Sequence, residues 1–212
     1  MKRSVLFFVV LIIHILAALL SLESLEIGSK VLLMPILFWT VFARRKSYPH
    51  VIPLFLGLLF SWFGDVLLIY DGQLFFILGL GSFLIAHLAY IFIFTKRMGL
   101  KVLRLWPFLG FAGLFCFGVL KNVLPPDLAL PVYVYMGMIS LMAFIASCRK
   151  VGGASYEYVL IGAVLFIISD AFIAVNQFLV PVPFVVIWVM STYGLAQFLV
   201  VNGLLKEDLK VS

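Results

Sequence analysis

The chain has 212 residues, of which 65% are hydrophobic and only 11% are charged, and its 15 Lys and Arg against 9 Asp and Glu give a net charge of +6. This composition excludes an ordinary soluble globular protein. One membrane crossing takes about 20 residues, so a chain that crosses several times has no room for a soluble catalytic domain. We therefore expect an integral membrane protein that acts in or at the bilayer, in contact with membrane lipids and without a nucleic-acid partner.

Apolar runs bounded by charged residues, Pro or Gly predict an all-α fold of eight transmembrane helices in a single domain, 1–212. Their approximate ranges are 5–22, 30–42, 51–70, 74–95, 103–123, 130–147, 158–179 and 182–205. The second run is short unless it extends upstream through Ile27. Lys2 and Arg3 precede the first run as in a signal peptide, but the run is long and lacks a clear cleavage site, so we expect it to be retained.

The basic residues sort to one side of an eight-helix bundle. Only Lys30 and Lys121 fall on the other side. By the positive-inside rule, both termini are expected in the cytoplasm and the protein in the cell (inner) membrane, where the basic loops suit anionic lipid headgroups. The residues on the cytoplasmic side are Lys2, Arg3, Arg44, Arg45, Lys46, Lys96, Arg97, Lys101, Arg104, Arg149, Lys150, Lys206 and Lys210.

Two carboxylates interrupt the apolar runs, Asp65 in the third and Asp170 in the seventh. An ionised carboxylate at such a depth costs several kcal/mol, so each Asp is expected to face the bundle interior. A single Asp there is equally compatible with a structural hydrogen bond between helices. Two of them favour a functional site.

The surroundings of the two Asp are similar. Aligning Asp65 with Asp170 places Gly57 on Gly162, and the helices that carry them are four crossings apart and run in the same direction. This pattern is compatible with two parallel four-helix repeats around one cavity. The next helices agree weakly, with Ser82, Ala86 and His87 laid on Thr192, Ala196 and Gln197.

Other polar residues share helix faces that could close such a cavity. His87 is a candidate third catalytic residue, although a lone His is also compatible with a structural hydrogen bond between helices. Tyr70, Tyr133, Tyr135 and Trp39 lie near predicted span ends and fit the interfacial aromatic belt. The candidate substrate-binding residues are Lys30, Ser61, Tyr90, Asn176, Tyr193 and Gln197.

We expect no cofactor and no metal site, although a metal site built from Asp65, Asp170 and His87 stays compatible with the sequence. The 3 histidines, His14, His50 and His87, do not make a three-ligand cluster. There is also no Gly-rich phosphate loop, no G-x-S-x-G elbow and no H-E-x-x-H motif. Nothing in the sequence indicates an oligomeric state.

Several strings together resemble a known family. They are KVLLMP at 30–35, FSWFGDVLL at 60–68, GLGSFLIAHLAY at 79–90 and GAVLFIISD at 162–170, followed by Asn176, Tyr193 and Gln197. These strings are similar to those of the YhhN-like membrane proteins, the lysoplasmalogenase family, although Val31 departs from the expected Lys-Pro. The resemblance implies an eight-span fold, a central role for both Asp, and a lysophospholipid substrate. It implies hydrolysis of the vinyl ether bond of lysoplasmalogens to a fatty aldehyde and glycerophosphoethanolamine or glycerophosphocholine.

This chemistry fits the residues. Vinyl ether hydrolysis needs a proton on the β-carbon, then water on the α-carbon, and one acid and one base suffice. Two carboxyls in a dry cavity repel each other when both are ionised, so one is expected to keep its proton as the acid while the other stays charged. The sequence leaves open which Asp is the acid and which stays charged. His87 or Tyr90 would orient or relay protons, and Lys30 would receive the substrate phosphate.

Two other classes of function are compatible with the sequence. Intramembrane carboxylates and a parallel repeat also describe a proton-coupled transporter of a small or lipid-like solute. However, the Pro residues of the second half lie at span ends, so the broken helices of transport sites are not evident. A structural or assembly protein would instead tolerate Asn at both Asp positions.

Overall fold

The computed structural model describes residues 2–46 and 48–207. Lys210, assigned above to the cytoplasmic side, lies outside these residues. Within them the regular elements are helices, as predicted, and one isolated bridge joins Met98 and Arg149. The α-helices are α1 Lys2–Leu19, α2 Glu23–Ala43, α3 Val51–Leu67, α4 Gln73–Thr95, α5 Leu105–Gly113, α6 Pro126–Ser147, α7 Ala154–Phe178 and α8 Val185–Glu207; a 3-10 turn, Val102–Arg104, precedes α5, and a π-helical segment, Leu114–Leu120, continues it.

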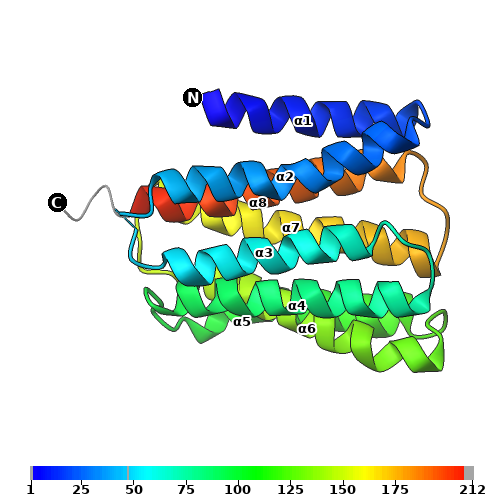
Figure 1. The fold of residues 1–212 in the computed structure, drawn as a ribbon. Helices are drawn as coiled ribbons and strands as arrows, with labels where there is room; N and C mark the ends of the chain where they lie inside the picture. The colour runs from blue at the N-terminus through cyan, green and yellow to red at the C-terminus, as the bar shows by residue number, and fades with distance from the viewer. Residues whose placement is uncertain (1, 47, 208–212) are drawn as a thin grey trace.

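The helices form one bundle in which successive helices run back and forth (Figure 1). The start of α1 and the end of α8 lie at the same end of the bundle. We call this the terminal end, and the other the loop end. The segments that join α1 to α2, α3 to α4 and α7 to α8 all lie at the loop end (Figure 1).

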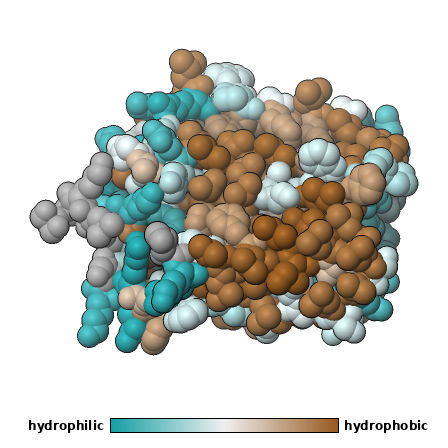
Figure 2. Space-filling view, turned by 90° about the horizontal axis from the view of Figure 1, so that it is seen from above, coloured by the Kyte–Doolittle hydropathy of each residue, from teal (hydrophilic) through white to brown (hydrophobic). Residues whose placement is uncertain are grey.

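Length and composition mark this as a multi-pass membrane protein. Seven segments are long and apolar enough to cross a membrane: α1, α2, α4, Val102–Leu120, α6, α7 and α8. The helix α3 is apolar but shorter, with 17 residues. Figure 2 shows a broad apolar band across the middle of the bundle, with hydrophilic side chains gathered at the terminal end. Exposed apolar side chains such as Leu103 and Ile52 belong to the surface that lipid would cover.

Three helices differ from the sequence prediction in ways that affect the interior. The helix α2 begins at Glu23 instead of residue 30, and its first turn contains Glu23 and Glu26, whose charges suit a helix N-terminus. The helix α6 begins at Pro126, since Pro is well suited to a first helical turn. The helix α3 ends at Leu67 and is followed by a turn in which Gly72 has a φ of 115°.

Small residues allow the helices of two hairpins to approach closely. A Cβ added at Gly57 would lie 2.7 Å from the Tyr90 ring, so α3 and α4 meet at this glycine. A Cβ added at Gly162 would lie 2.9 Å from the carbonyl oxygen of Ala196 and 3.1 Å from the amide nitrogen of Val200, so α7 and α8 meet there. Close contact at small residues is a main source of helix association in membranes.

The substitution Gly162→Ala is expected to destabilise the bundle, because the added methyl group meets backbone atoms that cannot move alone. Overpacking of this kind costs about 1–3 kcal/mol. The matched control is Gly81→Ala on α4, where no atom lies within 4 Å of the added Cβ. Thermal unfolding in detergent should show a lower melting temperature for Gly162→Ala only. Equal melting temperatures for the two variants would contradict this packing.

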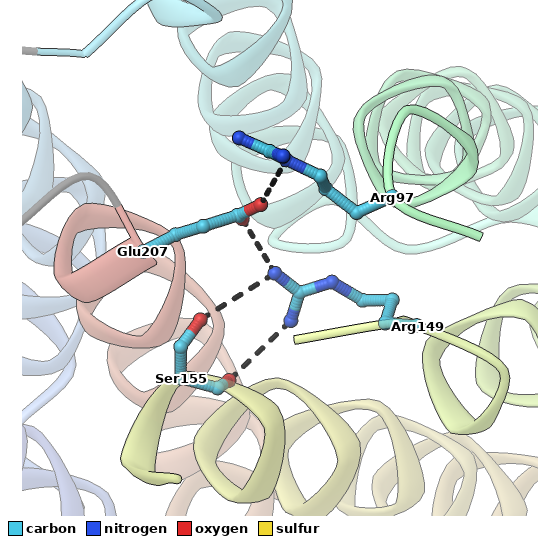
Figure 3. A network of polar contacts seen from close by, with 4 residues as sticks. All are labelled: Arg97, Arg149, Ser155 and Glu207. Carbon is cyan, nitrogen blue, oxygen red and sulfur yellow. Dashed lines mark hydrogen bonds and ion pairs between the residues drawn. The ribbon is translucent and has the colours of Figure 1, made fainter. Parts of the chain in front are cut away.

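A buried ion-pair network closes the terminal end of the bundle (Figure 3). Glu207, the last residue of α8, lies between two arginines and pairs with Arg97 at 3.1 Å and with Arg149 at 2.6 Å. Arg149 follows α6 and also donates to the backbone oxygen of Ser155 at the start of α7, at 3.3 Å. The Arg149 side chain is 1% exposed, whereas that of Arg97 is 51% exposed. The network therefore ties the ends of α4, α6 and α8 to the start of α7.

Candidate active site

Asp65 faces the bundle interior and is bonded to α8. Its residue is 4% exposed, and its carboxylate accepts a hydrogen bond of 2.8 Å from the Tyr193 hydroxyl. Ser61, one turn earlier on α3, points to the same helix, because its hydroxyl accepts a 2.8 Å hydrogen bond from Nε2 of Gln197. The prediction that these residues share a face is confirmed by these contacts.

Gln197 connects this cluster to α4. Its Oε1 accepts a hydrogen bond of 2.7 Å from the Tyr90 hydroxyl, while its Nε2 donates to Ser61 and lies 3.4 Å from the Tyr193 hydroxyl oxygen. Gln197 and Tyr90 are fully buried. A satisfied polar network in an apolar interior holds its members rigidly. The network therefore fixes the position of Asp65 from three helices.

Asp170 lies in a second cluster, between α6 and α7. Its Oδ2 accepts a short hydrogen bond of 2.5 Å from the Tyr135 hydroxyl. The His87 ring lies against Tyr135, with 5.4 Å between ring centroids, and also against Phe166. Nδ1 of His87 is buried and has no hydrogen-bond partner among the described residues. His87 therefore contacts Tyr135, the hydrogen-bond partner of Asp170.

The assignment of Tyr135 to the aromatic belt is wrong. Tyr135 is 4% exposed, whereas Tyr70 is 58% exposed. Because α6 begins at Pro126, Tyr135 lies more than two turns inside the helix. A sequence signal was present, since Val132, Tyr135, Met136 and Ile139 follow the spacing of one helix face, and all four are buried.

Between the clusters lie aromatic rings, with the Tyr193 ring 5.9 Å from that of Phe166 and 5.8 Å from that of Phe83. The site thus consists of two Asp–Tyr pairs with aromatic side chains between them.

Two neighbouring cavities lie in this part of the bundle, and Asp170 lines only the smaller one. The smaller, which we call the apolar cavity, has a volume of about 30 Å³, enough for one water molecule, and is lined by Asp170, Tyr135 and apolar side chains. The larger, which we call the polar cavity, has a volume of about 560 Å³ and lies toward the loop end. Asp65 lines neither cavity. The two cavities are neighbours, because both are lined by Leu68, Phe76, Ile173 and Phe178.

The remaining predicted residues, Lys30 and Asn176, line the polar cavity. Oδ1 of Asn176 accepts a hydrogen bond of 3.0 Å from the amide of Val182, so this side chain also supports the connection between α7 and α8. Sequence reasoning did not include His14 and Glu26, which line the same cavity. Among residues 2–46 and 48–207, no three His, Cys, Asp or Glu side chains gather in a way that could hold a metal ion.

Comparisons with known proteins agree with the resemblance noted in the sequence. The YhhN family model matches residues 25–204. The chain is 35% identical to human lysoplasmalogenase TMEM86A over 161 residues, which are 73% of this chain and 65% of the human protein. It is 32% identical to pig lysoplasmalogenase TMEM86B over 179 residues, 82% of this chain and 74% of the pig protein. The match thus spans just under two thirds of TMEM86A. No solved structure matches the chain significantly.

Proposed function

This chain belongs to the YhhN family, and from that membership and its two carboxyls inside the bundle, Asp65 buried and Asp170 half-buried, we propose that it hydrolyses the vinyl ether bond of lysoplasmalogens. The names of its relatives TMEM86A and TMEM86B support this activity. The observation that carries the proposal is Asp170, a carboxyl held by Tyr135 at the edge of an apolar cavity. That cavity adjoins a polar one, and a lysophospholipid likewise joins an apolar chain to a polar head.

In the proposed reaction, the Asp170 carboxyl transfers its proton to the β-carbon of the vinyl ether. We give it this role because Asp170, unlike Asp65, lines the apolar cavity. The resulting positive charge is shared by the α-carbon and the ether oxygen, and the Asp65 carboxylate stabilises it from the neighbouring cluster. Water then adds to the α-carbon and returns a proton to Asp170. Collapse of the hemiacetal releases the aldehyde and restores the glycerol hydroxyl.

The other predicted residues support these steps. Tyr193, Gln197, Tyr90 and Ser61 hold Asp65 in place through their hydrogen bonds. His87, whose ring packs at a tilt against that of Tyr135, orients Tyr135 and relays protons. Lys30 and Asn176 bind the polar part of the substrate in the polar cavity.

We also propose that α3 is a true crossing, so that eight helices span the cell membrane in two parallel four-helix repeats with both termini in the cytoplasm. Two observations support this. Hydrophilic side chains gather at the terminal end, and Gly57 packs on Tyr90 of α4 as Gly162 packs on Val200 of α8. The polar cavity would then open toward the non-cytoplasmic side.

The test of the function is aldehyde release from purified protein in detergent, with lysoplasmalogen as substrate. The control substrate is a lysophospholipid with an ester-linked chain, which cannot yield an aldehyde by this reaction. Release from lysoplasmalogen alone is expected. Absence of release from folded protein would exclude the hydrolase and turn attention to transport, measured as uptake into liposomes.

Removing the Tyr135 hydroxyl should slow the reaction. In Tyr135→Phe, Asp170 loses a hydrogen bond of 2.5 Å, and bonds to charged groups contribute roughly 1.5–3 kcal/mol. We expect kcat to fall about tenfold to a hundredfold, with little change in KM. Tyr133→Phe on the same helix, where no described hydrogen bond is removed, is the control. An unchanged kcat in Tyr135→Phe would contradict a role for this pair.

A further inference from the structure

One wall of the polar cavity carries groups that the proposed reaction does not use. His14 of α1 and Glu26 of α2 line this wall beside Lys30. His14 is 1% exposed, although it lies in a helix whose other polar residues are at its first turn. A buried His that borders a cavity is a candidate contact for whatever fills the cavity.

A hydrogen bond of His14 determines which ring nitrogen carries the proton and which has the lone pair. Nδ1 lies 3.0 Å from the backbone oxygen of Glu26, and a carbonyl oxygen can only accept. Nδ1 therefore carries the ring proton of the neutral imidazole. Nε2 then has a lone pair, which can accept a hydrogen bond.

Glu26 and Lys30 place opposite charges beside this acceptor. They are one turn apart on α2, at the spacing of neighbours on one helix face. Neither takes part in an ion pair within the part of the chain that the structure describes. Both are half-buried and border the same cavity. The wall thus offers one cation, one anion and one neutral acceptor, a set that complements a zwitterion.

We propose that Lys30, Glu26 and His14 form a head-group site that selects phosphoethanolamine over phosphocholine. The Lys30 ammonium binds the phosphate, while the Glu26 carboxylate and Nε2 of His14 accept hydrogen bonds from the protonated primary amine. A quaternary ammonium has no N–H to donate and is bound instead by aromatic faces. The substrate class rests on the proposed function, whereas the choice of amine rests on these three side chains.

The test is direct binding, which does not depend on catalysis. Lysophosphatidylethanolamine and lysophosphatidylcholine with the same ester-linked chain are titrated into purified protein in detergent, with calorimetric detection. The ethanolamine lipid is expected to bind at least tenfold more tightly. Glu26→Gln is expected to remove this preference by weakening only ethanolamine binding. Glu23→Gln, an exposed change on the same helix outside the cavity, is the matched control.

Two further variants separate the site from a general loss of structure. Glu26→Asp retains the carboxylate and should retain most of the preference. His14→Asn retains a donor for the Glu26 carbonyl but removes the acceptor, and should reduce the preference. Equal binding of the two lipids to the wild type, or an unchanged preference in Glu26→Gln, would overturn the proposal. A preference without aldehyde release would leave the head-group site standing and reject the hydrolase instead.

Discussion

The substitution Asp170→Asn is expected to lower the rate of aldehyde release about a thousandfold, within the range of general acid–base catalysis. Asn has nearly the same shape and can still accept the Tyr135 hydrogen bond, but it cannot deliver a proton. Asp65→Asn is expected to have a similar effect for another reason, since it removes the negative charge that stabilises the oxocarbenium ion. The measurement is single-turnover aldehyde release at matched amounts of folded protein.

The control for both variants is Asp127→Asn, an exposed residue in the first turn of α6. Its activity and melting temperature should equal those of the wild type. Full activity in either Asp65→Asn or Asp170→Asn would reject the two-carboxyl mechanism. Loss of both activity and folding would instead favour the structural interpretation of these residues.

The substitution Glu207→Ala is expected to give the largest loss of stability. It leaves the guanidinium of Arg149, with a side chain only 1% exposed, without its carboxylate. Burial lowers the pKa of Arg149, and Glu207 opposes this shift, so the pair is what makes the buried charge tolerable. Removing one partner of a buried pair costs about 3–5 kcal/mol. Thermal unfolding in detergent should show a clearly lower melting temperature.

Arg97→Gln tests the same network from its exposed side. The Arg97 side chain is 51% exposed, and its loss leaves no buried charge unpaired. The expected cost is therefore below about 1 kcal/mol. If Arg97→Gln were as harmful as Glu207→Ala, exposure would not be the property that decides the cost in this network.

The sequence predicted well the features that follow from the apolar character of the membrane interior. Apolar length predicted the helices, and the cost of a charge in lipid predicted that Asp65 and Asp170 face inward. The hydrogen-bond partner of each Asp was not predictable in the same way. Lipid is as apolar as a neighbouring helix, so hydrophobicity alone does not indicate which helices touch. That Asp65 meets Tyr193 of α8 while Asp170 meets Tyr135 of α6 depends on this packing.

The residues that line the polar cavity were also predicted only in part. Lys30, at the start of the second apolar run, was predicted to receive the substrate phosphate. Glu26 and His14 were not predicted as site residues, because Glu26 lay outside the predicted helix 30–42 and His14 stood alone in its run. The start of α2 at Glu23 brings Glu26 onto the face of Lys30, and α1 then places His14 beside them.

The shortness of α3, which we propose to be a membrane crossing, has a consequence for the lipid around the protein. Its 17 residues rise about 26 Å, less than the hydrocarbon thickness of about 30 Å. The turn that follows, with Tyr70 and Asp71 at the polar cavity, would draw the adjacent headgroups inward. Such hydrophobic mismatch is relieved by local thinning of the bilayer. In reconstituted vesicles, turnover should therefore vary with the acyl length of the host lipid and be highest in thin bilayers, where this thinning costs least.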